Sequence, residues 1–409
     1  MQVETAFILL FVVATGVAIA VRRVPVPYTV ALVITGLALG AWRFFPAPHL
    51  TRELLFGIFL PGLIFEAAFQ MDPRLFRANW TTIASLAVPG VVASMALTTL
   101  ALTPVIQALP VGARFSWREA LVFGALISAT DPVAVVALFR KLRVPRRLTT
   151  LLDGESLLND GTAVVFFTLA LALLGGAAPA AGELAGRFVF IVGVGALTGG
   201  CIGAGCSWLI RRIDDPMIEI ALTMIAAYGS FVTAESLHSS GVIASAAAGL
   251  LCGSFAVQAG MSETARVACR SFWEYLAFAL NSIVFLLLGL EVRLADLAHY
   301  WLPILIAYLV VTLSRGLILV VGRAVGSLSR DPPPWSWSLV LTWGGLRGAL
   351  PMVLVLTLPQ GFPWRDLLVA MTVGVAVLSI LGQGLTMRPL LARLRLLGEG
   401  TTAEEAHMG

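Results

Sequence analysis

The chain carries few charged residues for its length. Only 12% of its 409 residues are Asp, Glu, Lys or Arg, whereas soluble globular proteins carry about 25%. Hydrophobic residues make up 58% of the chain, and the mean hydropathy is +0.92. This composition excludes a soluble globular domain and predicts an all-α polytopic membrane protein.

The sequence also lacks the usual signatures of cofactor and metal chemistry. It has no Walker loop, no Rossmann glycine fingerprint and no metal-binding histidine cluster. The four cysteines lie in or beside apolar stretches without a metal-ligand spacing, so we expect them to pack as small apolar residues. The four histidines fall in loops, at the ends of apolar stretches or in the tail: His49, His238, His299 and His407. We therefore expect no cofactor and no enzyme active site.

Long apolar runs dominate what remains. About 20 apolar residues suffice for a helix to cross a bilayer, and polar breaks divide the chain into thirteen runs of about this length. The predicted helices cover residues 4–21, 28–45, 52–70, 80–104, 117–139, 147–174, 185–210, 216–236, 240–257, 270–290, 300–323, 335–358 and 366–387. The connections are too short for a soluble domain. We expect one transmembrane domain over 1–395 and a short disordered cytoplasmic tail over 396–409.

The basic residues are distributed unevenly over the connections. Of the 27 basic residues, 18 fall on one set of alternate loops and 7 on the other, while Arg315 and Arg347 lie within predicted helices. Loops on the cytoplasmic side carry the excess of Lys and Arg. The distribution predicts that the N-terminus lies outside and the C-terminus in the cytoplasm, which agrees with an odd number of helices. We expect a multi-pass protein of the plasma (inner) membrane.

The fifth and twelfth predicted helices are both interrupted. Thr130, Asp131 and Pro132 break the fifth, and the stretch TWGGLRG, which ends at Gly348, breaks the twelfth. Unwound backbone at membrane depth is tolerated only where it lines a cavity or is buried in protein. Interrupted helices at corresponding positions of two halves mark the binding site of many transporters. The pattern predicts inverted repeats with two interrupted helices that cross.

Acidic residues inside two neighbouring apolar runs give the strongest functional signal. Asp131 and Asp160 each lie in a run long enough to span a bilayer, and a carboxylate there costs about 2.5–3.5 kcal/mol on insertion scales. Ser156 is four residues before Asp160 and shares its helix face. Together with Thr130 they offer the oxygens that a monovalent cation prefers. A buried carboxylate keeps its proton more firmly than one in water, so cation and proton would compete for it, which is the chemistry of antiport.

Five motifs resemble a known family in order and spacing. The chain is similar to the monovalent cation:proton antiporter family, in its branch of NhaP-type and sodium–proton exchangers. The likeness runs from the third predicted helix to the thirteenth and rests on SATDPVAVVALF, GESLLNDGTAVVFF, SGVIASAAAGL, FWEYLAFALNSIVFLLLGLE and TWGGLRGALPMVLVLTLP.

The resemblance implies a role for each residue near the interruption. Asp160 would bind the cation and the proton, and Asn159 would be the other half of the Asn-Asp pair that marks the electroneutral branch. Thr130 and Asp131 would contribute from the unwound fifth helix, with Ser156 as a further ligand. The implied activity is exchange of Na⁺ (or Li⁺) for H⁺ by a homodimer. Helix capping is the competing interpretation for Asp131.

Four further polar residues have a role by resemblance or by position. Glu66 matches the family's third-helix acid, although it could equally stabilise a helix kink. Glu155 and Arg347 would form a structural ion pair, because an unpaired charge at mid-span is costly; ion binding is the alternative for Glu155. Arg315 is expected to anchor helix ends or to stabilise the core.

Two other functions fit some of these features. A K⁺/H⁺ antiporter would use the same ligands in a cavity of another size. A cation channel would need no titrating acid, so neutralising Asp160 would separate the two classes.

Overall fold

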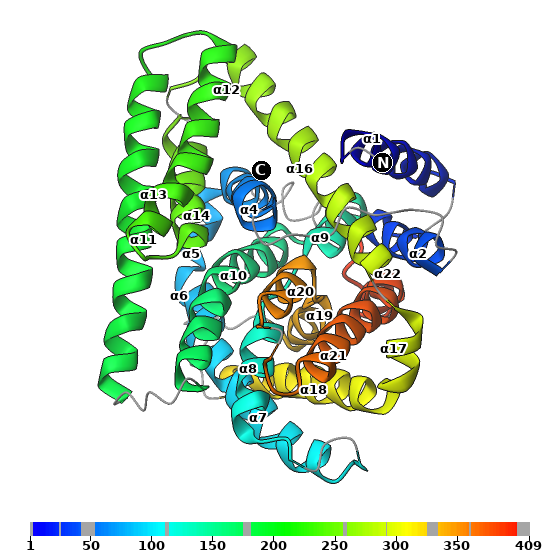
Figure 1. Ribbon diagram of the computed structural model, residues 1–409. Helices are drawn as coiled ribbons and strands as arrows, with labels where there is room; N and C mark the ends of the chain where they lie inside the picture. Colours follow the sequence, from blue (N-terminus) through cyan, green and yellow to red (C-terminus); the bar gives the residue numbers. More distant parts are fainter. Residues whose placement is uncertain are drawn as a thin grey trace. The chain divides into compact units, whose positions relative to one another are not determined.

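The computed structural model describes residues 3–23, 26–41, 54–110, 114–174, 181–256, 260–291, 293–324, 334–359 and 361–398. Every regular element in these ranges is a helix (Figure 1). The all-α prediction is therefore confirmed for the described residues. Most of the predicted tail, from residue 399 onward, lies outside them, as does the end of the second predicted helix at 42–45. At the start of that tail, Leu396 is buried and the Gly398 N–H donates to the Leu142 carbonyl over 3.2 Å.

The chain divides into two compact units, and two of the boundaries fall inside helices: between Asn159 and Asp160 in α10, and between Asn281 and Ser282 in α16. Unit 1 consists of 1–49, 79–159 and 282–409, and unit 2 of 50–78 and 160–281. The α-helices that begin in unit 1 are α1 (Val3–Val21), α2 (Tyr28–Ala41), α6 (Trp80–Ser85), α7 (Val91–Gln107), α8 (Trp117–Ser128), α9 (Val133–Leu142), α10 (Arg146–Leu174), α17 (Leu294–His299), α18 (Trp301–Ala324), α19 (Trp335–Gly344), α20 (Ala349–Leu356), α21 (Arg365–Leu378) and α22 (Gly384–Arg393). Those that begin in unit 2 are α4 (Leu60–Phe69), α5 (Pro73–Ala78), α11 (Ala181–Ile210), α12 (Pro216–Met224), α13 (Ser230–Ser236), α14 (Gly241–Leu251) and α16 (Glu263–Glu291).

Short π-helical segments join several of these helices into longer rods. They are η1 (Leu55–Phe59), η2 (Leu86–Gly90), η4 (Ile225–Gly229), η5 (Cys252–Ala256) and η6 (Ser379–Gln383). A π-helical turn inserts one residue into the helix and is found most often at functional sites. Here η2 contains Pro89, whose missing N–H cannot complete the regular helical ladder.

Each of the thirteen predicted runs coincides with a helix or a rod of the described chain. By length and composition, eight of the described helices can cross a membrane, and a ninth crossing is obtained if α19 and α20 form one span with a 43° bend. Four more apolar helices are shorter: Phe7–Val21, Tyr28–Ala41, Phe56–Phe69 and Gly241–Ser254. A multi-span membrane protein is thus confirmed, while thirteen crossings remain a prediction.

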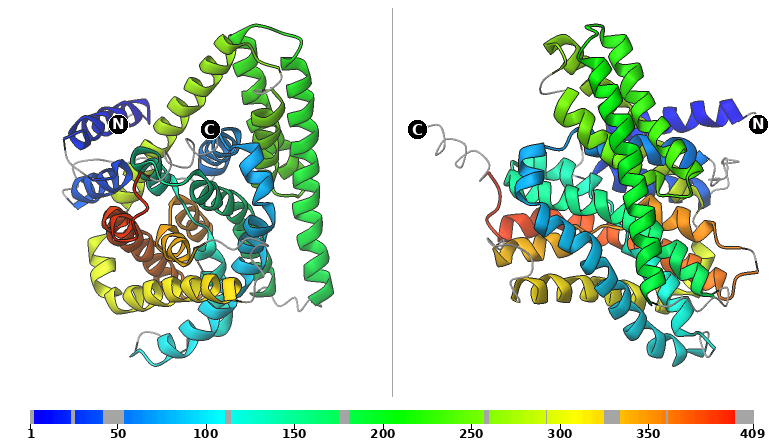
Figure 2. Two further views of the ribbon diagram at one scale, coloured as in Figure 1. Left: turned by 180° about the vertical axis from the view of Figure 1, so that it is seen from behind. Right: turned by 90° about the vertical axis from the view of Figure 1, so that its left-hand side faces the viewer.

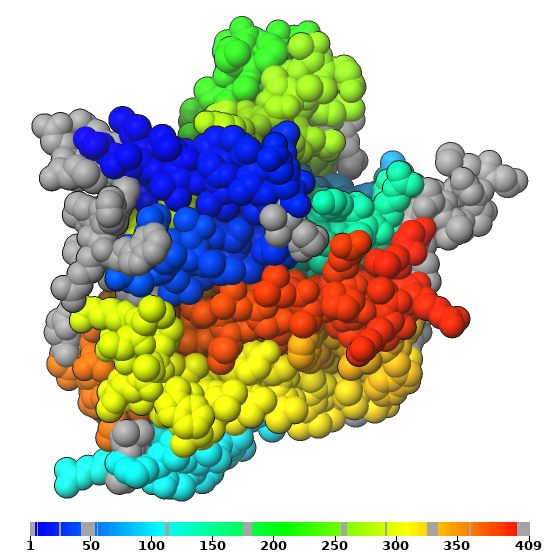
Figure 3. Space-filling view, turned by 90° about the vertical axis from the view of Figure 1, so that its right-hand side faces the viewer, coloured from blue at the N-terminus to red at the C-terminus, as the bar shows by residue number. Residues whose placement is uncertain are grey.

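Unit 1 places its helices side by side around the two interrupted ones. Helix α18 packs against α7 and α21, and α20 packs against α8 and α21 (Figure 2). One face of this unit shows α1, α2, the α21–α22 rod and α18 as successive bands (Figure 3). Large apolar side chains such as Phe115, Phe123 and Phe139 are fully buried and form part of the apolar interior of the unit.

Unit 2 is built on close packing of α11 against α14. A Cβ atom on Gly203 would lie 2.8 Å from the Ala248 Cα, so only glycine permits this approach. Small residues at helix contacts are the usual means of tight packing in membranes. The adjoining core includes Phe65 and Trp273, whose ring centroids lie 4.6 Å apart.

Candidate ion-binding site

The two interruptions predicted from sequence are present and meet within unit 1. Helix α8 ends at Ser128 and α9 begins at Val133, while α19 ends at Gly344 and α20 begins at Ala349. The Asp131 backbone N–H donates to the Leu346 carbonyl over 2.8 Å. A Cβ on Gly348 would collide with the Asp131 side chain, so the two unwound segments touch only because residue 348 is glycine. The backbone groups freed by one break therefore satisfy part of the other.

Three polar side chains of the predicted site come together beside this crossing. The Ser156 hydroxyl donates to the Thr130 carbonyl, and the Asn159 amide donates to the Thr130 hydroxyl over 3.3 Å. All three residues are buried, with 1–4% of each exposed. Helical spacing explains the pairing, because Ser156 and Asn159 are three residues apart and share a face of α10. The structure thus brings Thr130, Ser156 and Asn159 together, while their role as ion ligands stays a prediction.

Asp131 has a local structural contact. One of its carboxylate oxygens accepts the Val133 N–H over 3.0 Å, at the start of α9. This is the capping geometry that competes with ion binding in the sequence analysis. This contact is a single hydrogen bond to one oxygen, and a carboxylate can accept several hydrogen bonds. A ligand role for Asp131 therefore remains a prediction beside its capping contact.

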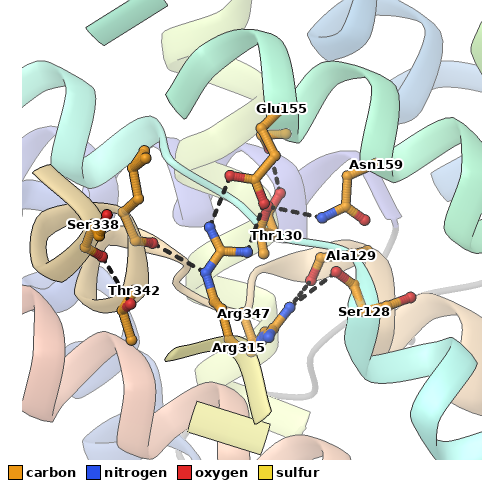
Figure 4. A network of polar contacts seen from close by, with 11 residues as sticks. Ser128, Ala129, Thr130, Glu155, Asn159, Arg315, Ser338, Thr342 and Arg347 are labelled. Carbon is orange, nitrogen blue, oxygen red and sulfur yellow. Dashed lines mark hydrogen bonds and ion pairs between the residues drawn. The ribbon is translucent and has the colours of Figure 1, made fainter. Parts of the chain in front are cut away.

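The buried ion pair differs from the one predicted. Glu155 pairs with Arg315, not with Arg347: the two Arg315 Nη atoms lie 2.6 and 2.9 Å from the two Glu155 carboxylate oxygens (Figure 4). The Arg315 Nε also donates to the Leu341 carbonyl over 3.0 Å. The side chains are 10% and 4% exposed, so the pair lies in a nearly dry environment. A planar guanidinium suits such two-point recognition of a carboxylate.

Arg347 instead binds the end of helix α8. Its Nη1 donates to the carbonyls of Ser128 and Ala129 over 2.9 and 3.1 Å, and its backbone N–H donates to the Ser379 hydroxyl over 3.0 Å (Figure 4). The last carbonyls of a helix lack intrahelical donors and carry partial negative charge. Arg347 therefore stabilises the interruption that exposes these carbonyls, a role that the sequence analysis missed. The available signal was its position inside the glycine-rich break.

A small cavity adjoins this network in unit 1. Its volume is about 20 Å³, and Ser128, Glu155, Asn159, Arg315 and Arg347 contribute to its lining. A cavity volume of about 10–15 Å³ is enough to hold one water molecule. The space beside Asn159 can therefore hold a water-sized particle next to polar side chains.

The remaining predicted residues belong to unit 2. Asp160 follows Asn159 directly in α10 and is half-buried. Glu66 lies in α4, where one of its carboxylate oxygens accepts a hydrogen bond from the Gln70 amide one turn later. Gln70 was not singled out from the sequence, although the i to i+4 spacing of an acid and an amide on one helix is a readable signal. Among the described residues, no group of three or more His, Cys, Asp or Glu has the arrangement of a metal site.

Known proteins resemble the chain over most of its length. A family model described as the transmembrane sodium/hydrogen exchanger matches residues 7–393. The Na⁺/H⁺ antiporter ApNhaP of Aphanothece halophytica is 38% identical over 384 residues, which cover 91% of this chain and 71% of that protein. The Na⁺/H⁺ antiporter NhaH of Halobacillus dabanensis is 34% identical over 406 residues, which cover 95% and 97%.

A solved structure shares the fold. The sodium proton antiporter MjNhaP1 from Methanocaldococcus jannaschii at pH 8 superimposes with a TM-score of 0.75 and 20% identity, covering 94% of this chain and 100% of that one. The chain therefore belongs to the sodium/hydrogen exchanger family of transmembrane proteins.

Proposed function

We propose that the chain is a secondary transporter, not an enzyme, which exchanges Na⁺ (or Li⁺) for H⁺ by competition at Asp160. Its family and the names of its relatives, which are Na⁺/H⁺ antiporters, support the reaction. The same comparisons give no support to the K⁺/H⁺ alternative.

One observation carries the proposal. Thr130, Ser156 and Asn159 meet inside unit 1 at the break between α8 and α9, and Asn159 is followed in α10 by Asp160. A broken helix frees backbone carbonyls, and hydroxyl, amide and carboxylate oxygens then complete the set of ligands that a hard monovalent cation prefers. Asp160 would supply the charge, with Thr130, Ser156 and Asp131 as further oxygen ligands and Asn159 and Glu66 close to the ion's path.

The charges of unit 1 support an electroneutral exchange. Glu155 and Arg315 cancel one another in their ion pair, and Arg347 faces helix carbonyls. If Na⁺ and H⁺ compete for the Asp160 carboxylate, this acid binds either one cation or one proton at a time. Each complete cycle then moves one Na⁺ against one H⁺ and transfers no net charge.

The setting of the transporter follows the same proposal. It would lie in the plasma membrane with its N-terminus outside and its C-terminus in the cytoplasm, because 18 of its 27 basic residues fall on the loops of one side. It would act as a homodimer and contribute to pH homeostasis. Movement of the helices that bear the site would alternate its access between the two sides of the membrane.

The test uses purified protein in liposomes with an imposed pH gradient. We expect Na⁺ or Li⁺ to collapse the gradient, and Asp160→Asn to abolish the response. A voltage clamp with valinomycin and K⁺ should leave the Na⁺ response unchanged if exchange is electroneutral. Collapse by K⁺ alone would favour the K⁺/H⁺ antiporter, and a cation conductance that survives in Asp160→Asn would indicate a channel. An unaltered antiport rate in Asp160→Asn would refute the role of this acid.

A further inference from the structure

Unit 2 contains a buried carboxyl group that the proposed exchange does not use. Glu219 lies one turn into α12, and none of its surface is exposed. Both of its carboxylate oxygens are buried, and neither has a hydrogen-bond partner among the described residues. Buried polar groups are normally hydrogen-bonded, so such a group requires an explanation.

The donors near the start of α12 are already engaged. The Asp215 carboxylate accepts the backbone N–H groups of Met217 and Ile218 over 2.8 and 3.3 Å, and the Asp215 carbonyl accepts the N–H of Glu219 itself over 2.9 Å. One turn further on, the Thr223 hydroxyl donates to the Ile220 carbonyl over 2.8 Å. The free N–H groups of a helix start would otherwise stabilise an anion. Here they are bound to Asp215.

The charges that act on Glu219 have the same sign as an ionised glutamate. Asp214 and Asp215, which lie exposed just before α12, repel a negative charge on it. On α16, the buried Cys269 thiol is a further titratable group of unit 2. A charge placed here would have no hydrogen-bond donor among the described residues to offset its loss of hydration.

Basic residues on the neighbouring helices have other described contacts. At the end of α11, the Arg212 guanidinium lies 4.2 Å from the centroid of the Trp208 ring. On α16, Arg266 pairs with Glu263 over 3.3 Å. Three further titratable or charged residues lie in this part of unit 2: Cys206 near the end of α11, Arg211 directly after it, and Arg270 on α16.

We propose that Glu219 is a proton-binding site of unit 2, separate from the Asn159–Asp160 pair, and that it makes the packing of α12 sensitive to pH. The neutral acid fits the buried, donor-free position. Exposed Asp214 and Asp215 stand at the water-facing start of the helix, where they can exchange protons between Glu219 and solution. Loss of the proton places an uncompensated charge in the core and destabilises the packing of α12.

The sign of the pH effect follows from proton linkage. In this proposal the buried, neutral Glu219 holds a proton that the solvated glutamate of the unfolded chain releases, so folding binds a proton at this site. Stability linked to it is therefore greatest in acid and falls as pH rises. Glu219→Gln keeps the shape and neutrality of the protonated acid and removes this dependence.

Infrared spectroscopy of the full-length protein in lipid tests the proton directly. We expect a carboxylic acid C=O band near neutral pH that is absent in Glu219→Gln. The control is Glu235→Gln, because Glu235 is exposed on α13 and its carboxylate accepts the Gly241 N–H over 3.2 Å; the band should persist there. Thermal unfolding should show wild type and Glu219→Gln equal in acid, with wild type losing stability progressively as pH rises.

Several results would overturn the proposal. An unchanged acid band in Glu219→Gln would mean that Glu219 is ionised. The same conclusion would follow if Glu219→Gln and the apolar Glu219→Met both failed to fold, because the site would then require a negative charge. Parallel unfolding curves for wild type and Glu219→Gln at every pH would refute the linkage to packing. None of these measurements depends on transport, so they stand apart from the test of the exchange reaction.

Discussion

Removing Arg315 should destabilise the protein far more than its single charge suggests. Its guanidinium holds both oxygens of Glu155 at 2.6 and 2.9 Å, and the Glu155 side chain is only 4% exposed. Arg315→Met leaves this carboxylate buried without its counter-ion. Breaking a buried pair from one side costs about 3–5 kcal/mol. We therefore expect the free energy of unfolding of Arg315→Met to fall by about that amount.

A double-mutant cycle separates the ion pair from the loss of side-chain packing. Glu155→Gln combined with Arg315→Met removes both charges, and it should recover much of the stability lost in Arg315→Met. Residues in direct contact show coupling energies of about 0.5–3 kcal/mol. We expect a value near the upper end of this range for Glu155 and Arg315, because their ion pair is buried and joined by two hydrogen bonds. The assay is reversible unfolding in mixed micelles, with the four proteins of the cycle measured side by side.

The matched control replaces Arg347 in the same cycle. Arg347 binds the carbonyls of Ser128 and Ala129, so Arg347→Met should destabilise the end of α8 whether or not Glu155 is charged. Its coupling to Glu155→Gln should be the smaller of the two. If Arg347 couples to Glu155 as strongly as Arg315 does, the assignment of the ion pair to Arg315 is wrong.

Three further predictions concern the crossing, the helix packing and the ion competition. Gly348→Ala places a methyl group against the Asp131 side chain and should cost about 1–3 kcal/mol of stability together with transport activity; normal unfolding and exchange would contradict the close crossing. Gly203→Ala should destabilise unit 2, whereas Gly205→Ala, with nothing within 4 Å of its added methyl group, should be neutral or gain about 0.5–1 kcal/mol from helix propensity; equal unfolding temperatures would argue against the contact of α11 with α14. In liposomes, competition between H⁺ and Na⁺ at Asp160 should raise the apparent KM for Na⁺ as the pH falls on the side from which Na⁺ is taken up. The rise should approach about tenfold per pH unit where Asp160 is mostly protonated, with little change in the maximal rate. A KM independent of pH would exclude competition at one acid.

Several features of the candidate site could be predicted from the sequence, because they depend on residues that are close together along the chain. Thr130, Asp131 and Pro132 break a helix by their own backbone preferences, and Ser156 and Asn159 share a face by helical spacing alone. The contacts of Ser156 and Asn159 with Thr130 follow once the two helices are neighbours. The partner of Glu155 could not be found in this way. Arg315 and Arg347 are both arginines inside apolar runs. Which of them reaches Glu155 depends on the direction in which each side chain points in the folded protein.

The sequence by itself determined the class of the protein, the positions of its helices and the two interruptions. Hydropathy, glycine and proline act over a few neighbouring residues, so their effects can be read without knowing the fold. Three facts follow from the fold alone: Arg315 neutralises Glu155, Arg347 binds the end of α8, and Glu219 is buried with no hydrogen-bond donor among the described residues. In the sequence Glu219 looks like an ordinary acid near a helix start. Its burial depends on neighbours in space, among them α16, which begins more than forty residues later and whose Trp273 indole N–H donates to the Thr223 hydroxyl of α12 over 3.0 Å.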